Sequence, residues 1–90
     1  MSEERHTYYA VYLFPNAVET LGEAIKPFLR ESVSGQHIVC SEIDAGGGLF
    51  EMTIPGHDAN GKPVECEVML PAAMVKLVVS MRRDTDIGFT

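Results

Sequence analysis

The sequence has only two cysteines and few basic residues, and each shortage excludes a class of protein. Two cysteines in 90 residues are too few for the disulfide framework of a small secreted domain, which predicts free thiols and a cytoplasmic location. Seven lysines and arginines against thirteen acidic residues give a net charge of −6, whereas nucleic acids and anionic membranes attract positive surfaces. We therefore expect neither direct nucleic-acid binding nor membrane association.

Long apolar runs are also missing. No stretch approaches the roughly 20 residues of a membrane-spanning helix, and the opening MSEERHTYY lacks the apolar core of a secretory signal. A composition that is 46% hydrophobic and 22% charged is instead typical of a globular domain. We expect a single domain over residues 1–90, with loosely ordered ends at 1–6 and 84–90.

Hydrophobic patterning predicts the element order β-α-β-β-β-α. Aromatic and β-branched residues indicate a first strand over 7–14. Apolar residues then recur at helical spacing as far as Leu29, with Asn16 as a candidate N-cap and Pro27 predicting a kink or an early end. The remaining elements are expected to be three strands and a second helix, over 36–44, 49–54, 63–70 and 71–83.

The last of these elements is ambiguous. The run PAAMVKLVVSMRR has an apolar stripe at helical spacing and a proline suited to a first helical position, which favours a helix. Its three valines also suit a strand, so a strand over 74–81 stays open. The expected fold is a two-layer α+β sandwich, with both helices on one face of a mostly antiparallel sheet. The place of the first strand in that sheet is left undetermined.

The segment PGHDANGKP, residues 55–63, contains most of the phosphate-binding pattern G-x-x-x-x-G-K-[ST]. A phosphate loop needs a hydroxyl residue after the lysine and then a helix, but here Pro63 and a strand follow. Asn60-Gly61 between two alternating strands instead predicts a hairpin with a type I′ turn. We therefore expect no nucleotide and no other cofactor.

Residues that catalyse reactions or bind metals are sparse. Closely spaced pairs of cysteine or histidine are absent, so no metal site is expected. Cys66 falls on the apolar side of its strand and is predicted to be a small core residue. Cys40 is predicted on an outward face, but no base is visibly placed to activate it. We expect a protein that is not an enzyme, and keep as the alternative a small-molecule-binding protein or small enzyme that uses Cys40 or His57.

A group of acidic residues serves no evident purpose in folding. The alternation of the three middle strands places five carboxylates on one outward face with no basic residue among them: Glu42, Asp44, Glu51, Glu65 and Glu67. Like charges opposite one another destabilise a sheet, typically by a few tenths of a kcal/mol for each pair. The pattern predicts either a solvated face that limits aggregation or a docking surface for a basic protein. In a sharper version, the chain inhibits a protein by occupying its basic nucleic-acid-binding groove.

Apolar residues exceed what so small a domain can cover. Tyr8 and Tyr12 on the first strand, with Val75 and Val79 on the last element, form a candidate homodimer surface. The sequence thus predicts a small acidic interaction module with a basic protein partner and a candidate homodimer surface.

Overall fold

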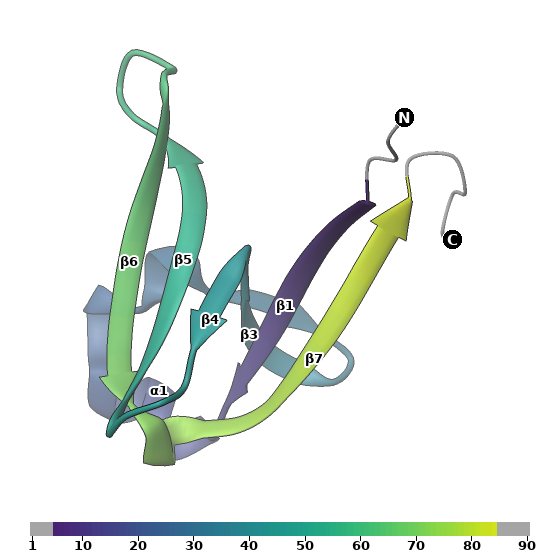
Figure 1. The fold of residues 1–90 in the computed structure, drawn as a ribbon. Coiled ribbons are helices and arrows are strands. Elements are labelled where there is room, and N and C mark those ends of the chain that lie inside the picture. Colours follow the sequence, from purple (N-terminus) through teal and green to yellow (C-terminus); the bar gives the residue numbers. More distant parts are fainter. Residues whose placement is uncertain (1–4, 85–90) are drawn as a thin grey trace.

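Two antiparallel β-sheets make up most of the chain, and they diverge from a shared base like the arms of a V (Figure 1). The computed structural model describes residues 5–84. The first sheet has the strand order β2-β3-β1-β7, with bounds Arg30–Ser32, Gly35–Cys40, Arg5–Leu13 and Val75–Asp84. The second sheet has the order β4-β5-β6, with bounds Glu42–Asp44, Leu49–His57 and Pro63–Pro71. The ends predicted to be loosely ordered lie outside the described residues, apart from positions 5, 6 and 84 in β1 and β7.

The two-helix sandwich expected from the sequence is wrong. The structure is mostly β, and its second predicted helix is instead the short 3₁₀ turn η3 (Ala72–Met74) followed by strand β7. β7 pairs with β1 along its whole length, from Arg5 opposite Asp84 to Leu13 opposite Val75. Helical and strand periodicities both fit this segment. The free backbone groups of β1 and its apolar side chains on both faces favour a neighbouring strand, and pairing with β1 therefore selects the strand. This pairing also makes β1 a central strand.

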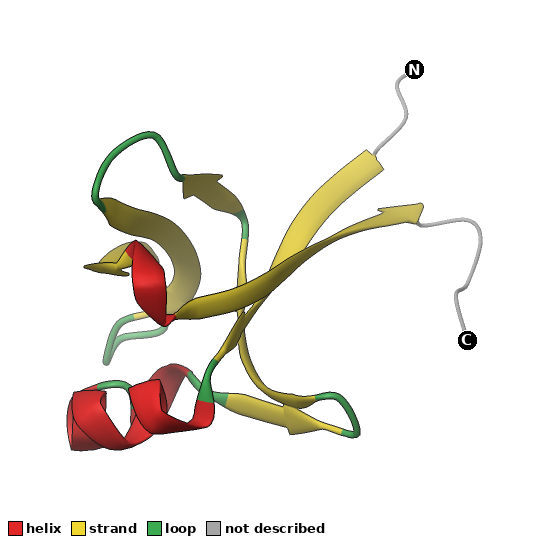
Figure 2. Ribbon diagram, turned by 90° about the horizontal axis from the view of Figure 1, so that it is seen from below, coloured by secondary structure: helices red, strands yellow, loops and turns green. Residues whose placement is uncertain are grey.

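A short helical region links β1 to β2 and packs at one end of the core (Figure 2). It consists of α1 (Pro15–Leu21) and two 3₁₀ turns, η1 (Gly22–Ala24) and η2 (Lys26–Phe28). Pro15 occupies the first helical position, where its missing N–H costs nothing, so Asn16 is not the predicted N-cap. The helix ends at Gly22, whose φ of 68° favours glycine, and this break precedes Pro27.

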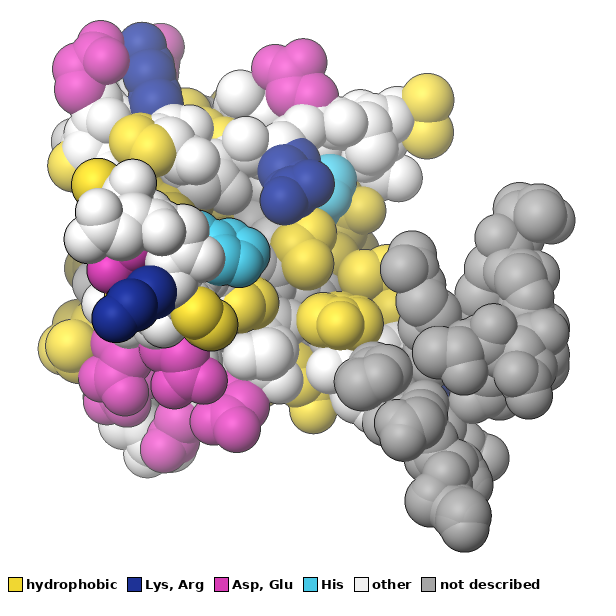
Figure 3. All heavy atoms as spheres, turned by 90° about the horizontal axis from the view of Figure 1, so that it is seen from above, with side chains coloured by type: hydrophobic (Ala, Val, Ile, Leu, Met, Phe, Trp, Pro, Cys, Tyr) yellow, Lys and Arg dark blue, Asp and Glu magenta, His cyan; other side chains and the backbone are white. Residues whose placement is uncertain are grey.

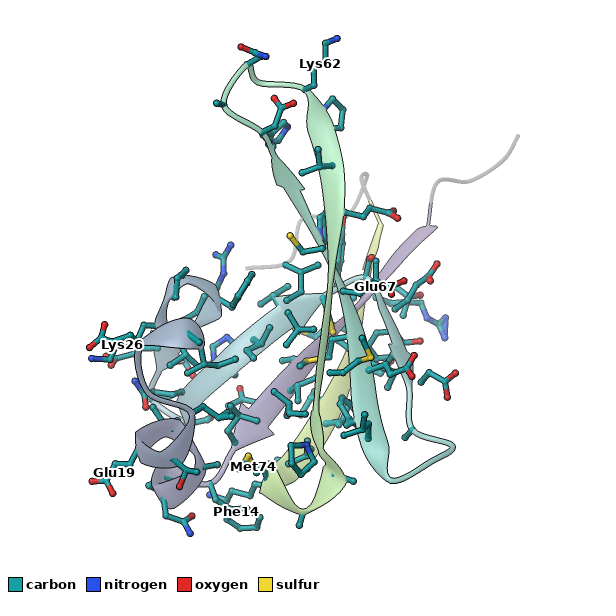
Figure 4. All side chains as sticks on the ribbon, turned by 90° about the vertical axis from the view of Figure 1, so that its left-hand side faces the viewer. Phe14, Glu19, Lys26, Lys62, Glu67 and Met74 are labelled. Atoms are coloured by element: carbon teal, nitrogen blue, oxygen red, sulfur yellow. The ribbon has the colours of Figure 1, made fainter. Side chains whose placement is uncertain are left out.

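The core lies between the two sheets and the helical region. Its buried side chains come from β1, β3, β5, β6 and the helical region: Val11, Leu13, Ala17, Ile25, Ile38, Cys40, Phe50, Met52 and Leu70. Phe50 and Met52 lie inward, as the alternation of β5 predicts. The corner between β6 and β7 closes this core, where Phe14 N donates to Met74 O at 3.2 Å (Figure 4).

The chain passes from one sheet to the other at Ser41, between β3 and β4. Ser41 N donates to Thr53 O at 2.8 Å, and Ser41 Oγ donates to the same oxygen at 3.2 Å. Cys40 belongs to the first sheet and is buried, whereas Glu42 belongs to the second sheet and is exposed. The bend therefore overturns the prediction that Cys40 and Glu42 share an outward face.

The hairpin between β5 and β6 is confirmed, but its turn is not type I′. Gly61 N donates to Asp58 O at 3.0 Å, and Gly61 has a φ of 82° while Asn60 does not have positive φ. Asp58 holds the turn from inside, because its Oδ1 accepts hydrogen bonds from Asn60 N at 2.8 Å and Lys62 N at 3.0 Å. A turn with glycine at its single positive-φ position, locked by an aspartate side chain, takes the place of the expected Asn-Gly pair.

Two valines provide a matched test of this core. Val11 is 0% exposed and Val33, in the β2–β3 turn, is 105% exposed. We expect Val11→Ala to lower the free energy of unfolding by about 2–3 kcal/mol, since it removes two buried methyl groups and leaves a cavity. Val33→Ala is expected to change it by less than about 0.5 kcal/mol. Urea denaturation of both variants measures the difference, and equal effects would contradict the assignment of the core.

Candidate protein-docking surface

The five predicted carboxylates lie together on the outer face of the second sheet. Residues directly opposite one another in neighbouring strands share a face, and Thr53 of β5 lies opposite both Glu42 of β4 and Glu67 of β6. Asp44 lies opposite Glu51, and Glu65 precedes Glu67 by two positions along β6. All five carboxylate residues are exposed. We call Glu42, Asp44, Glu51, Glu65 and Glu67 the acidic face.

Strand geometry fixes the spacing of these charges. Directly opposite side chains begin about 5 Å apart, and alternate residues on one strand about 7 Å apart. Seen from above, a group of Asp and Glu side chains gathers on one side of the molecule, with a Lys or Arg side chain at its border and the other visible Lys, Arg and His side chains farther away (Figure 3). The acidic face is therefore a dense negative surface on a rigid sheet.

Among residues 7–82, whose side chains the structure describes, no basic side chain neutralises this surface. The ion pair that the described residues form joins Lys26 to Glu23 at 3.0 Å, in the helical region. Lys62 is the one basic residue between positions 42 and 67, and it lies at the tip of the β5–β6 hairpin, away from Glu67 (Figure 4). Asp44 uses Oδ1 to accept a hydrogen bond from Gly46 N at 3.0 Å, which shapes the loop but does not neutralise the charge.

A shallow depression of about 170 Å³ lies at the centre of the acidic face, where Glu42, Asp44, Glu51 and Glu67 surround Thr53. Among the side chains that the structure describes, no three His, Cys, Asp or Glu residues converge closely enough to hold a metal ion. The depression thus presents separate carboxylates that can each accept a charged hydrogen bond from a partner.

Two exposed apolar residues adjoin the acidic face, and the sequence analysis missed them. Met69 lies opposite Glu51 on the same face and is 51% exposed, and Leu49 precedes Glu51 by two positions and is 48% exposed. The sequence could have predicted this position, because Leu49 and Met69 each lie two residues from an outward-facing glutamate on the same strand. Apolar contacts beside charges are typical of protein interfaces, in which a desolvated centre adds affinity to electrostatic attraction.

The two thiols exchange the roles that the sequence predicted. Cys40 is fully buried, with Sγ 3.8 Å from Tyr9 O, and burial raises the pKa of its thiol to about 11. Cys66 is exposed, although its cross-strand neighbour Ile54 packs on the core. The inward side of the hairpin at Cys66 lines an open groove and is not packed into the core. Cys40 is therefore a core residue, and Cys66 is not.

A groove of about 570 Å³ lies between this hairpin, the first sheet and the helical region. Its walls are mostly apolar, and Arg30 supplies a positive charge: Phe28, Leu29, Ile54, Pro55 and Cys66 are among the lining residues. His57, the other candidate catalytic residue, is exposed near the hairpin tip and does not line this groove.

The candidate dimer residues fall into two groups. Tyr8, Tyr12 and Val79 share one face of the first sheet, where Tyr8 also lines this groove and Tyr12 contacts His37 with ring centroids 5.0 Å apart. Val75 lies opposite Leu13 and packs against the core. The outer faces of the two sheets therefore differ in chemistry, one apolar and aromatic and the other acidic.

Comparisons with protein-family models, curated proteins and solved structures found no match to this chain. Among the described residues, no helix has the length and apolar character needed to cross a membrane.

The buried Cys40 thiol predicts a specific loss of stability in alkali. The unfolded chain releases this proton near pH 9, whereas the folded chain retains it to about pH 11. The stability that the protonated thiol contributes is therefore complete below pH 9, and the free energy of unfolding falls by about 2 kcal/mol as the pH rises through 11. Urea denaturation from pH 8 to 11 should show a steeper fall for the wild type than for Cys40→Ala. Parallel curves for the two proteins would contradict the assigned burial.

Proposed function

We propose that this chain is a small, non-enzymatic interaction module that docks a basic protein through the acidic face. The observation that carries the proposal is the placement of five carboxylates on one sheet face, with no ion pair to any side chain of residues 7–82. A fold keeps a surface of this kind at some cost in stability, because its like charges repel one another across the strands. A cationic partner removes that repulsion on binding.

The apolar residues beside the acidic face favour docking over simple solvation. A face that serves only solubility gains nothing from exposed Met69 and Leu49 next to Glu51. In a complex, these two side chains provide contact area that slows dissociation, while the carboxylates guide the approach of the partner. The partner surface best suited to this face carries several Lys or Arg side chains around an apolar spot.

In its sharper form, the proposal is that the partner's basic surface is a nucleic-acid-binding groove and that the chain blocks it. Carboxylates held about 5–7 Å apart on a sheet then occupy positions that phosphates take in the partner's nucleic-acid complex. Displacement of the partner's nucleic acid by this chain distinguishes the inhibitor from an adapter that binds elsewhere on the partner.

The groove beside Arg30 supports a second candidate, a small-molecule-binding protein. Apolar walls and one cation suit an amphipathic anion, such as a medium-chain carboxylate. An enzyme that uses Cys40 fits the geometry less well, because that thiol is buried and its pKa is raised.

The acidic-face proposal is tested with two variants of equal charge. The face variant changes Glu51, Glu65 and Glu67 to Gln, and the control variant changes the exposed Glu19, Glu23 and Glu31 to Gln. Each variant therefore loses three negative charges. Proteins captured from lysate of the native host are identified, purified and titrated. We expect the face variant to bind the captured basic partner at least about 10-fold more weakly, and the control variant to bind it nearly as well as the wild type.

Salt provides the second readout of the same experiment. Raising the ionic strength from about 0.05 to 0.5 M shortens the Debye length several-fold, so wild-type affinity should fall steeply and face-variant affinity only slightly. If the face variant and the control variant lose affinity equally relative to the wild type, net charge, and not the acidic face, attracts the partner. Equal binding by all three proteins would place the docking site elsewhere.

A further inference from the structure

Strand β7 ends its sheet with an unprotected edge. It pairs with β1 on one side, and no described strand pairs with its other side. Its ten residues therefore leave a row of backbone N–H and C=O groups available to another strand. The register irregularity and Lys76 lie near its start and Arg82 near its end, so the central run LVVSM has no charge, proline or bulge.

The other three sheet edges in the described part are protected. β6 begins and ends with proline and carries Glu65 and Glu67. β4 has three residues, two of them acidic, and β2 has three exposed residues including Arg30 and Glu31. Short length, charge and proline are the devices that keep an edge from pairing. β7 lacks all of them over its central run.

The same strand also carries an apolar row on its outer face. Leu77, Val79 and Met81 lie opposite Tyr12, Ala10 and Tyr8 of β1, and all three β7 side chains are exposed. A strand added beside β7 covers part of this row and pairs the free backbone groups at the same time. The open edge and the apolar row are separate observations that mark one surface.

We propose that β7 pairs antiparallel with β7 of a second copy, so that two four-stranded sheets join into one of eight strands. The identical strand fits because it supplies the same length and the same alternation, and because its central run brings no opposing charge. A twofold axis at Val78 sets Leu77 opposite Val79 of the partner subunit and Lys76 opposite Ser80 of the partner subunit. An axis at Val79 would set Lys76 against Arg82 of the partner subunit, which disfavours that register.

The proposed dimer leaves the acidic face open, because β7 and the acidic face belong to different sheets. A single added strand buries little area compared with a standard protein interface, so the association is expected to be weak and dependent on concentration. In the dimer, two acidic faces are available to partners, which raises the avidity for a repeated or dimeric basic surface.

Sedimentation velocity of the full chain, from about 1 μM to about 1 mM, tests this inference. We expect a shift from monomer to dimer with concentration. Val79→Lys should raise the dissociation constant at least about tenfold, because it adds charge at the paired edge. Val64→Lys is the matched control, since Val64 is also a valine that is 39% exposed, on the protected edge of β6, and it should dimerise like the wild type. Leu77→Lys repeats the test at a second position, and circular dichroism confirms that each variant folds.

A wild type that stays monomeric across this range would overturn the inference, as would a dimer that Val79→Lys and Leu77→Lys both leave intact. Loss of dimer in the Val64→Lys control would place the interface on β6 instead and would also overturn it. The variant with Gln at positions 51, 65 and 67 should dimerise normally, so this result and the fate of the acidic-face proposal are independent.

Discussion

The bend at Ser41 is the constraint on which the rest of the structure depends. One run of chain, β3 followed by β4, belongs to both sheets, and two hydrogen bonds from Ser41 to Thr53 O fix the point of transfer. Because the strand changes sheets there, Cys40 lies in the core while Glu42 faces solvent. The same bend turns the outer faces of the two sheets in different directions, as the diverging arms in Figure 1 show.

Two surfaces of different chemistry follow from that divergence. The outer face of β4-β5-β6 carries five carboxylates beside two exposed apolar residues, and the outer face of the other sheet is apolar and aromatic. The first surface suits a charged partner, whose binding weakens as salt is added. The second suits an apolar contact, which salt does not weaken in this way. Since the surfaces lie on separate sheets, occupation of one leaves the other accessible.

The sequence predicts the local pattern well and its tertiary context poorly. Alternation places Phe50 and Met52 inward and groups the five carboxylates on one face, because a period of two depends on the strand alone. Whether an inward residue is covered depends on neighbouring elements, and Cys66 lines an open groove instead of packing into the core. The segment 75–83 fits both helical and strand periods, and only its pairing with β1 decides between them. The Ser41 bend has no sequence signal of its own, so the burial of Cys40 was not predictable.

Backbone amide spectra of the ¹⁵N-labelled chain, titrated with its captured basic partner, test the central claim most directly. The account predicts that shifts and line broadening concentrate on β4, β5 and β6 around Glu51, Thr53 and Glu67, and that the amides of β7 and the helical region change little. Changes confined to β7, or to the groove beside Arg30, would contradict the claim that the acidic face is the docking surface.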